Sequence, residues 1–386
     1  MPSSIPILVI ADDLSGAAEL AQIAAARGLS AVVERHTDCR IAAEVTATDT
    51  DSRASTAATA ARQIEAIAEQ ARRCGAVRIF KKVDSLLRGQ PRAEIEALVP
   101  ALRCERTLLI PANPSRGRTI SGGQYFVNGI PVNKTGFADD PEFPRTSADI
   151  ASLMGTGSLP IHNVRTPAEL PSAGIIVPDI EFADDIRYWA ETIDSSVLAA
   201  GAADLFAAML DRWCGHFAAK DVPASPSIEL PGLLVCGSHA AWQSRKDDCE
   251  CAKLPVLEVG RVHAGERLDI DNFVTASHAL RSHRALVLSS GQALISLDER
   301  GVRLQALARM AALVIRQAKP RTLLLEGGAT AAAVVSQLGW NRFAAQPSTT
   351  PGVGILKPSG DEAAPLVLIK PGSYPWPREI WESFCG

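Results

Sequence analysis

Short apolar segments alternate with amphipathic ones along most of the chain. Residues 5–11 (IPILVIA) form a continuous aliphatic run of the length expected for a strand buried on both faces. In residues 301–319, by contrast, Leu304, Leu307 and Ala311 follow helical spacing, which predicts an amphipathic helix. Strands and helices in alternation predict an α/β fold in which mostly parallel sheets are flanked by helices.

Further strands are expected wherever a short aliphatic or β-branched run ends in a polar or glycine-containing turn. These runs are residues 77–84, 107–111, 174–180, 233–239, 285–291, 322–328 and 366–369. Ser15 can cap a helix that follows the first strand. Another helix is expected to start near Pro91, because proline is favoured in the first helical turn.

The chain has 386 residues, which is too long for one ordinary hydrophobic core and indicates two domains. Residues 219–232 contain three prolines and little periodicity. We therefore expect a first domain at 1–222, a linker at 223–232 and a second domain at 233–386, with the active site in the cleft between the domains. A second irregular region, residues 111–146, carries several arginine and other polar side chains and is typical of a binding loop.

Composition and charge narrow the classes of function. The formal net charge is −4 and the sequence pI is about 6.0, so the chain has no general attraction to nucleic acid or to an anionic membrane. No apolar run approaches the roughly 20 residues that cross a bilayer, and the first residues lack the layout of a secretory signal. The eight cysteines follow no zinc or redox spacing, so we expect reduced thiols in a cytoplasmic protein. The sequence leaves open whether the chain forms a homo-oligomer.

Two adjacent carboxylates, Asp12 and Asp13, follow the first expected strand in the run ADDLSG. Ligands of open α/β sheets bind at the carboxyl ends of the strands. Carboxylates placed there can accept hydrogen bonds from substrate hydroxyl groups, or accept a proton from one. The simpler alternative is that Asp12 only caps the following helix.

The run KKVDSLLRG at 81–89 places further charges at the end of a second expected strand. In an extended segment Lys82 and Asp84 point to one side, while Lys81 points to the other. Arg88 adds a planar guanidinium group suited to a carboxylate or a phosphate, and Arg53 follows another run, TDSR. The alternative interpretation is a solvated, charged turn.

Small residues end several strands in the C-terminal half. Ser238 follows one strand, residues 326–330 (EGGAT) follow another, and residues 370–373 (KPGS) follow a third. Small residues allow backbone N–H groups to approach phosphate oxygens, and a helix N-terminus favours the negative charge. None of these turns matches the P-loop or the dinucleotide fingerprint. Each alone could be an ordinary turn, but together they favour a nucleotide site.

Several multi-residue runs, in the same order, resemble the four-carbon acid sugar kinase family. ADDLSGA is similar to the family's ADDLTGA, TDSR to its TDTR-type turn, and KKVDSLLRG to KKxDSTLRG. PANPSRGRTISGGQYFVNGIPV resembles the family's long loop of the form PAxxxxGRTxxGGxxxVNGxP. The resemblance covers nearly the whole chain and is most specific in its N-terminal half.

This resemblance implies an N-terminal domain that binds a small sugar acid and a C-terminal domain that binds ATP with Mg²⁺. It implies substrates such as threonate, erythronate or 3-oxo-tetronate. By position, the residues implied in the substrate site are Asp12, Arg53, Lys82, Arg88 and Gly123, with Asp13 and Asp84 as candidate catalytic residues. Those implied in the nucleotide site are Ser238, Gly327, Gly328, Ala329, Thr330 and Gly372, and no protein ligand of a metal is assigned.

The C-terminal half departs from the family pattern. Where the family has GGDT or GGET, this chain has GGAT at 327–330, so an acidic side chain is missing. The hypothesis that Glu326 compensates for it is motivated only by its proximity in the sequence. The family's LKSGNFG has become IKPGSYP at 369–375, and its PGVP turn has become PGVG at 351–354.

The expected reaction is ATP-dependent phosphorylation of a hydroxyl group on a small sugar acid of four carbon atoms. Arg53, Lys82 or Arg88 would hold the substrate carboxylate, and turn amides and Mg²⁺ would offset charge on the transferring group. Asp13 or Asp84 would accept the hydroxyl proton, and the sequence does not distinguish between them.

Two other classes of protein compete with this interpretation. The altered nucleotide motifs are compatible with a sugar-acid-binding protein that has lost phosphoryl transfer, and binding of an ATP analogue would separate that protein from a kinase. A nicotinamide-dependent dehydrogenase also suits the α/β pattern, but no expected strand is followed by its glycine fingerprint.

Overall fold

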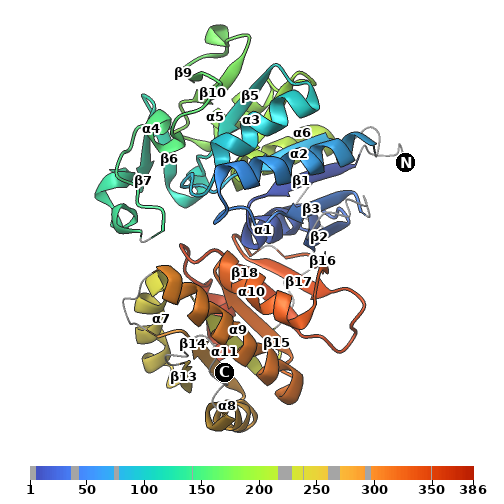
Figure 1. Ribbon diagram of the computed structural model, residues 1–386, viewed down its shortest axis with the longest axis vertical. Helices are drawn as coiled ribbons and strands as arrows, with labels where there is room; N and C mark the ends of the chain where they lie inside the picture. The colour runs from blue at the N-terminus through green and yellow to red at the C-terminus, as the bar shows by residue number, and fades with distance from the viewer. Residues whose placement is uncertain are drawn as a thin grey trace. The chain divides into compact units, whose positions relative to one another are not determined.

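The computed structural model describes residues 6–35, 43–73, 78–140, 142–215, 228–237, 239–259, 270–291, 297–348 and 350–386. The described residues fold into two compact units. The first is formed within Met1–Ala24 and Arg35–Lys220, and the second within Ala25–Glu34 and Asp221–Gly386. Each unit has its own strands and its own helices (Figure 1).

The sheet of the first unit contains seven parallel strands. In spatial order they are β3 (Val45–Asp49), β1 (Ile7–Ala11), β4 (Arg78–Lys82), β11 (Val197–Gly201), β5 (Arg106–Ile110), β10 (Gly174–Pro178) and β9 (Ile161–Val164). In register, Ala11 of β1 lies opposite Asp49 on one side and Lys82 on the other. The turns that follow these three strands therefore meet at one edge of the sheet.

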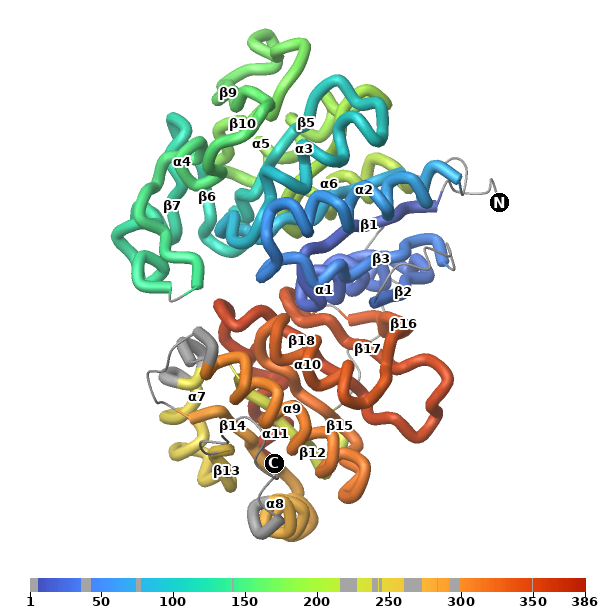
Figure 2. The backbone as a smooth tube through the Cα atoms, in the orientation of Figure 1, coloured from blue at the N-terminus to red at the C-terminus, as the bar shows by residue number. Residues whose placement is uncertain are grey.

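Helices cover both faces of this sheet. They are α1 (Leu14–Ala25), α2 (Ala57–Arg73), α3 (Pro91–Leu102), α5 (Ala183–Ala190) and α6 (Ala203–Cys214). Connections between parallel strands are right-handed, so α2 and α3, which lead from β3 to β4 and from β4 to β5, share one face. Both helices lie side by side there, as Figure 2 shows. The connection through α5 runs back from β10 to β11, which places α5 and its neighbour α6 on the opposite face.

The first helix begins differently from the expectation. Ser15 was expected to be the cap, but α1 already starts at Leu14, so Ser15 lies inside its first turn. Asp13, the residue before Leu14, accepts a hydrogen bond from the backbone N–H of Gly16 at 2.7 Å. That is the geometry of an N-cap, and Asp13 is the cap because its carboxylate reaches the backbone of the first helical turn.

The region expected to be an irregular loop contains a small antiparallel sheet. Its strands are β6 (Arg118–Ser121), β7 (Gln124–Val127) and β8 (Ile130–Pro131). Short helices surround it or lie nearby: η1 (Pro114–Arg116), η2 (Val132–Lys134), η3 (Gly136–Asp139), α4 (Ile150–Met154) and η4 (Pro167–Glu169). The glycines and prolines of this region turn the chain between these short elements instead of leaving it without structure.

The sheet of the second unit is parallel on one side and antiparallel on the other. Its strands are, in order, β13 (Val256–Glu258), β14 (Ala285–Ser289), β12 (Gly232–Cys236), β15 (Thr322–Glu326), β18 (Leu366–Lys370), β17 (Gly354–Pro358), β16 (Arg342–Ala345) and β2 (Ala31–Arg35). The first five are parallel, and the pairs β18–β17, β17–β16 and β16–β2 are antiparallel.

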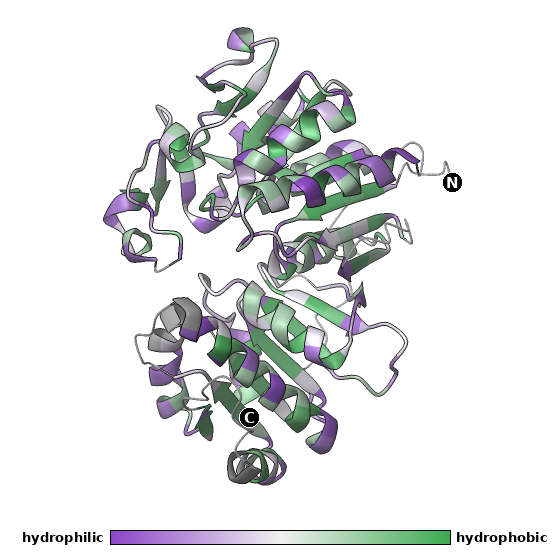
Figure 3. Cartoon of the chain, in the orientation of Figure 1, coloured by the Kyte–Doolittle hydropathy of each residue, from purple (hydrophilic) through white to green (hydrophobic). Residues whose placement is uncertain are grey.

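The helices of the second unit also lie on both faces of its sheet. They are α7 (His239–Cys251), α8 (Ile270–His283), α9 (Leu297–Ala318), α10 (Gly328–Leu338) and α11 (Arg378–Cys385). Helices α9 and α10 pack side by side on one face. On the other face Trp242 of α7 and Phe384 of α11 join Leu234, Leu324 and Leu368 of the strands in one buried cluster. Figure 3 shows the apolar residues concentrated on the strands.

The α/β fold with mostly parallel sheets is confirmed. An observed strand overlaps each of the eight expected runs, and α9 covers all but the last residue of the helix expected at 301–319. The helix expected near Pro91 is α3, with that residue at its first position. Half of the expected linker, residues 223–227, lies outside the described part of the chain, so the domain boundaries stay a prediction. Among the described helices, none has the length and apolar character that crossing a membrane demands.

The contribution of α11 to the buried cluster of the second unit can be tested by substituting two phenylalanines. Phe384 is fully buried, whereas Phe182, which precedes α5, is 69% exposed. We expect Phe384→Ala to lower the free energy of unfolding by about 3–5 kcal/mol, because it removes a buried ring and leaves a cavity. Phe182→Ala should change it by less than about 0.5 kcal/mol. Urea unfolding of both variants gives the comparison, and equal losses would contradict this packing.

Candidate functional site

Charged side chains gather in the first unit where β1, β3 and β4 end. Asp12 and Asp13 follow β1, Arg53 lies in the turn after β3, and Asp84 and Arg88 lie in the turn after β4. The register of the three strands brings these turns together. All five residues were expected in the sugar-acid site, and the structure places them in one connected network.

Arg53 is at the centre of this network. Its Nε donates to Asp12 Oδ2 at 2.7 Å and its Nη2 donates to Asp12 Oδ1 at 3.1 Å, which is a bidentate pair. Its Nη1 donates to Asp13 Oδ2 at 2.5 Å, and Nη2 lies 3.6 Å from Asp84 Oδ1. The side chain keeps 20% of its surface exposed, so Arg53 is not fully enclosed by its partners.

Arg88 pairs with Asp84 inside a single turn. Its Nε and Nη2 donate to the two carboxylate oxygens of Asp84 at 2.9 and 2.8 Å. The backbone N–H groups of Leu86 and Arg88 also donate to Asp84 Oδ2, at 3.0 and 3.2 Å. Asp84 thereby closes its own turn, and Arg88 is oriented with 18% of its side chain exposed.

The arginines keep the neighbouring carboxyl groups ionised. Burial alone would raise the pKa of Asp84, but the charges of Arg88 and Arg53 hold it well below the ordinary value. For Asp12, burial likewise acts to raise the pKa, and the charge and hydrogen bonds of Arg53 lower it overall. The edge therefore presents alternating negative and positive groups, a surface suited to a ligand that carries both hydroxyl groups and a carboxylate.

Lys82 reaches toward α1. Its Nζ donates to the backbone carbonyl of Val83 at 2.9 Å and lies 3.8 Å from Glu19 Oε2. Burial raises the pKa of Glu19, although the charges of Lys82, Arg116 and Arg118 act to lower it. Glu19 was not anticipated from the sequence, although a single charged residue in the otherwise uncharged helix α1 is a signal that could have identified it.

Lys81 points to the other side of β4, as expected for adjacent strand residues. It is fully buried, and its Nζ lies 2.9 Å from Glu94 Oε2 and donates to the carbonyl of Lys82 at 2.9 Å. Glu94 also accepts from the hydroxyl of Ser52. Through the hydrogen bond from Ser52, the Lys81–Glu94 pair supports the turn that carries Arg53. In the sequence Glu94 stands between Arg92 and Glu96 in the first half of α3, so its charge alone does not distinguish it.

The small sheet and its flanking loop hold the turn after β4. Tyr125 donates its hydroxyl to the carbonyl of Ser85, and Arg118 donates to the Ser85 hydroxyl. Arg145 donates from Nη1 to the carbonyls of Leu86 and Leu87 at 3.3 and 3.1 Å. Leu87 has a positive φ of 58°, a conformation that needs such support in a bulky residue.

Gly123 is not brought to this network. It lies in the turn between β6 and β7 with a φ of 71°. Its N–H approaches Asp179 Oδ1 at 3.3 Å, and an added Cβ would meet Asn163 at 2.3 Å. Its neighbours thus belong to β9 and to the loop after β10, so the structure supports a turn-forming role for Gly123 and separates it from the five charged residues.

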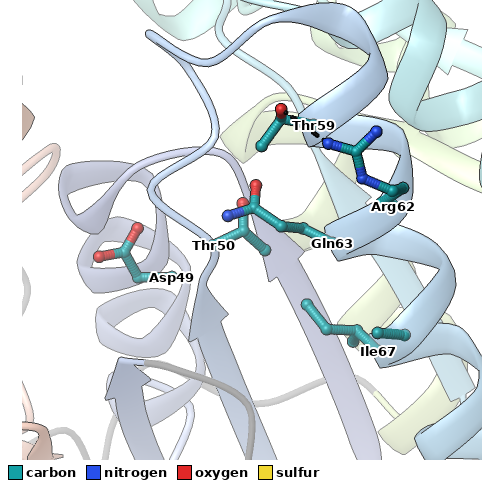
Figure 4. Close-up of a pocket in the computed structure, with 7 residues that line it drawn as sticks. Asp49, Thr50, Thr59, Arg62, Gln63 and Ile67 are labelled. Carbon is teal, nitrogen blue, oxygen red and sulfur yellow. Dashed lines mark hydrogen bonds between the residues drawn. The ribbon is translucent and has the colours of Figure 1, made fainter.

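A cavity of about 310 Å³ adjoins the turn that carries Arg53. It is lined by Asp49, Thr50, Thr59, Arg62, Gln63, Ala66 and Ile67 (Figure 4). Thr50 and Gln63 point toward each other, and Arg62 Nη2 donates to Thr59 Oγ1 at 3.2 Å. Its lining comes from β3, the turn and α2 alone.

Three strand-end turns meet at the corresponding edge of the second unit. Gly237 follows β12, Gly327 follows β15, and Gly372 lies in the turn after β18. The N–H of Gly327 donates to the carbonyl of Lys370 at 2.9 Å, and an added Cβ at Gly237 would meet Thr330 Oγ1 at 2.6 Å. These contacts bring the turns together.

The N-terminus of α10 is open at this edge. Gly327 is its N-cap with a φ of 97°, which favours glycine. Gly328 and Thr330 are buried, whereas Ala329 is exposed in the first turn. Ser238, also expected in the nucleotide site, lies outside the described residues.

Glu326 does not stand in for the missing acidic residue. Its Oε1 accepts from Lys370 Nζ at 2.5 Å, and both of its oxygens accept from Arg245 at 3.3 Å. The carboxylate is 1% exposed and is already paired with two cations, so it is not free to bind a ribose or a metal. In the described part of the chain, no three histidine, cysteine or acidic side chains form a group that could hold a metal ion.

Comparisons with known proteins agree across the chain. The family described as the sugar-binding N-terminal domain matches residues 7–209. The D-threonate kinase of Bordetella bronchiseptica is 30% identical over 350 residues, which cover 86% of this chain and 83% of that protein. The 3-oxo-tetronate kinase of Methylobacterium radiotolerans is 24% identical over an alignment that covers 96% of this chain and 96% of that protein.

A solved structure shares the fold. The crystal structure of a Haemophilus influenzae protein superimposes with a TM-score of 0.68 at 19% identity, over 98% of this chain and 99% of that one. At this identity the likeness concerns the fold alone.

The buried carboxyl group of Asp49 predicts a pH dependence of stability. Burial, and then the charge of Asp51, raise the pKa of Asp49 to about 7, although Arg35 lowers it. The folded protein therefore retains a proton that the unfolded chain releases above its ordinary pKa of 3.8. The stabilisation is present below that value and is lost as the pH rises toward 7, by about 1.4 kcal/mol per pH unit from this group.

Urea unfolding from pH 4.5 to 7.5 measures this effect. The free energy of unfolding of Asp49→Asn should fall less steeply with pH than that of the unaltered protein. Asp194→Asn is the control, because hydrogen bonds from Ser196 lower the pKa of Asp194 and remove it from this pH range. Parallel curves for the unaltered protein and Asp49→Asn would contradict the assignment.

Proposed function

The chain belongs to the family of the sugar-binding N-terminal domain, and we propose that it is an ATP-dependent kinase that phosphorylates a hydroxyl group of a four-carbon sugar acid. The observation that carries this proposal is the match of two kinds of four-carbon sugar-acid kinase to 86% and 96% of the chain, together with the charged network around Arg53. The relatives supply the class of reaction, and the network supplies chemistry that fits its acceptor.

The sugar acid would bind at the Arg53 network. Arg53 and Arg88 are oriented by aspartates and partly exposed, so each can offer donors to the substrate carboxylate. Asp12, whose pKa is lowered by Arg53 against the effect of burial, would accept hydrogen bonds from substrate hydroxyl groups as a carboxylate. Lys82 would add positive charge beside them.

Asp13 is the better candidate for the proton acceptor. Asp84 receives four hydrogen bonds from its own turn, which makes it a structural part of that turn. Asp13 holds α1 through Oδ1, while its Oδ2 accepts from Ser15 at 2.7 Å and from Arg53. If the substrate carboxylate takes over part of the Arg53 guanidinium, Asp13 Oδ2 becomes available to a hydroxyl proton.

ATP would bind at the glycine turns of the second unit. The positive φ of Gly327 and the exposed Ala329 in the first turn of α10 fit a phosphate group, because the N–H groups and the dipole at a helix N-terminus favour negative charge. Gly328, Ala329, Thr330 and Gly372 would frame this position. ATP would supply the phosphoryl group, and Mg²⁺ would be held mainly by phosphate oxygens, its common arrangement in kinases.

Substitution of the two aspartates tests the assignment of the base. We expect Asp13→Asn to lower kcat by about 10²–10⁴-fold, because asparagine can still cap α1 but cannot accept the proton. Asp84→Asn should weaken the turn and raise the KM of the sugar acid, with a smaller loss in kcat. The measurement is steady-state kinetics on each folded variant. Similar kcat losses in both variants would refute the choice of Asp13.

A coupled assay of ADP formation tests the function itself. D-threonate, erythronate and 3-oxo-tetronate would be supplied in turn with ATP and Mg²⁺, with a reaction lacking the acid as the control. We expect at least one four-carbon acid to stimulate ADP formation. A chain that binds a sugar acid, but neither forms ADP nor binds an ATP analogue, would instead be a binding protein that has lost phosphoryl transfer.

A further inference from the structure

Three charged side chains are buried together in the second unit, directly beneath its strand-end turns. Lys370 ends β18 and is fully buried, Glu326 ends β15 and is 1% exposed, and Arg245 of α7 is buried as well. Lys370 Nζ lies 2.5 Å from Glu326 Oε1, and Arg245 donates to both oxygens of Glu326 at 3.3 Å. We call these three residues the buried triad.

Stability does not explain such a triad. Removing charges from water costs free energy that their mutual attraction seldom exceeds, so apolar side chains of similar volume often stabilise a core equally well. Burial accordingly lowers the pKa of Lys370, although Glu326 acts to raise it. The benefit of the triad is therefore to be sought in the geometry that its hydrogen bonds impose.

Lys370 closes the turn that contains Gly372. Besides Glu326, its Nζ donates to the carbonyl of Pro371 at 3.2 Å and to the carbonyl of Tyr374 at 2.6 Å. Both carbonyls flank Gly372 in the sequence. The ammonium group of Lys370 therefore holds the backbone of residues 371–374 in its turn through hydrogen bonds to two carbonyl groups.

Glu326 ties the same ammonium group to the next turn. It directly precedes Gly327, the N-cap of α10, and Gly327 donates its N–H to the carbonyl of Lys370 at 2.9 Å. The ion pair between Lys370 and Glu326 and this backbone hydrogen bond are parallel links between two strand ends. The two glycine turns are consequently held in one spacing.

Two tryptophans cover the buried triad. The ring centroid of Trp376 lies 5.2 Å from Lys370 Nζ, and that of Trp381 lies 4.8 Å from Arg245 Cζ. Cation–π contacts of this kind are strongest when water is excluded. They keep the cations in place and strengthen the hydrogen bonds that shape the turns.

We propose that Lys370, Glu326 and Arg245 are positioning residues that hold the turns at Gly327 and Gly372 in the spacing required by the phosphate groups of a nucleotide. This inference rests on the proposed function, since it concerns the nucleotide site of that reaction. Arg245 also pairs with Asp248 at 2.6 Å, so the charges of the triad are balanced and its contribution is geometric. It acts on the nucleotide through the turns and does not touch it.

The first unit contains a matched control. Lys81 and Glu94 form another fully buried lysine–glutamate pair beneath a strand-end edge, at 2.9 Å. Glu94→Gln removes a charge in the same kind of environment as Glu326→Gln, but under the turn of Arg53. A general loss of stability would affect both variants alike, whereas loss of positioning would affect nucleotide binding in Glu326→Gln alone.

The experiment is calorimetric titration of the full chain with Mg²⁺ and an ATP analogue that has a non-hydrolysable β–γ bond. We expect Lys370→Met and Glu326→Gln to raise the Kd of the analogue roughly tenfold or more, because small displacements of binding groups are costly. Glu94→Gln should leave this Kd within about twofold. In kinetics, Lys370→Met should raise the KM of ATP and leave that of the sugar acid unchanged.

The outcomes separate the inference from the proposed function. Absence of analogue binding by the unaltered chain would overturn the proposed function itself. Tight binding by the unaltered chain and by both triad variants would overturn only the positioning role. Equal losses in Glu326→Gln and Glu94→Gln would also overturn it.

A double variant protects the test against a failure to fold. In Lys370→Met/Glu326→Leu both partners of that ion pair become apolar, and Arg245 keeps its ion pair with Asp248 at 2.6 Å, so no buried charge is left without a partner. Thermal unfolding first establishes that this chain is folded. A folded double variant that binds the analogue as tightly as the unaltered chain would refute the proposal, and weakened binding would support it.

Discussion

Ion pairs buried beneath the carboxyl ends of parallel strands are the interaction on which both candidate sites depend. A charge withdrawn from water must be paired and hydrogen-bonded, so each pair dictates where its partners and their backbone lie. Lys81 with Glu94 sets the turn that carries Arg53, and Lys370 with Glu326 sets the turns of the second unit. The strands deliver these residues to the edge, and the requirement for pairing then shapes the turns.

The two edges use charge in different ways. In the first unit, Arg53 and Arg88 keep about a fifth of their side chains exposed while aspartates orient them, so they can exchange one carboxylate partner for another. In the second unit, Lys370 and Glu326 are fully covered, and they hold the glycine turns at the ends of their strands. The first arrangement suits recognition of a small acid, and the second suits phosphate groups held by N–H donors.

Much of the fold followed from local patterns, but strands of mixed character were missed. The strands at 7–11, 285–289 and 322–326 are buried throughout and mainly apolar, because both of their faces are covered. β13 and β16 are largely exposed or half-buried and carry no such run, and the small sheet β6–β8 uses glycine-rich turns that resemble a loop. Capping by Asp13 in place of Ser15 depended on which side chain reached the first helical turn.

The sequence by itself determined the alternating α/β architecture, the family, and the polar residues that end each strand, because these depend on periodicity and on short contiguous runs. Only the tertiary structure decided how the charges are paired: Arg53 joins carboxylates about 40 residues away, Glu94 reaches Ser52, and Glu326 meets Lys370 and Arg245. Pairing of buried charges is a long-range condition, satisfied by whichever side chains the sheet register and helix packing bring together. For the same reason Gly123, although part of a recognisable motif, lies apart from the charged network.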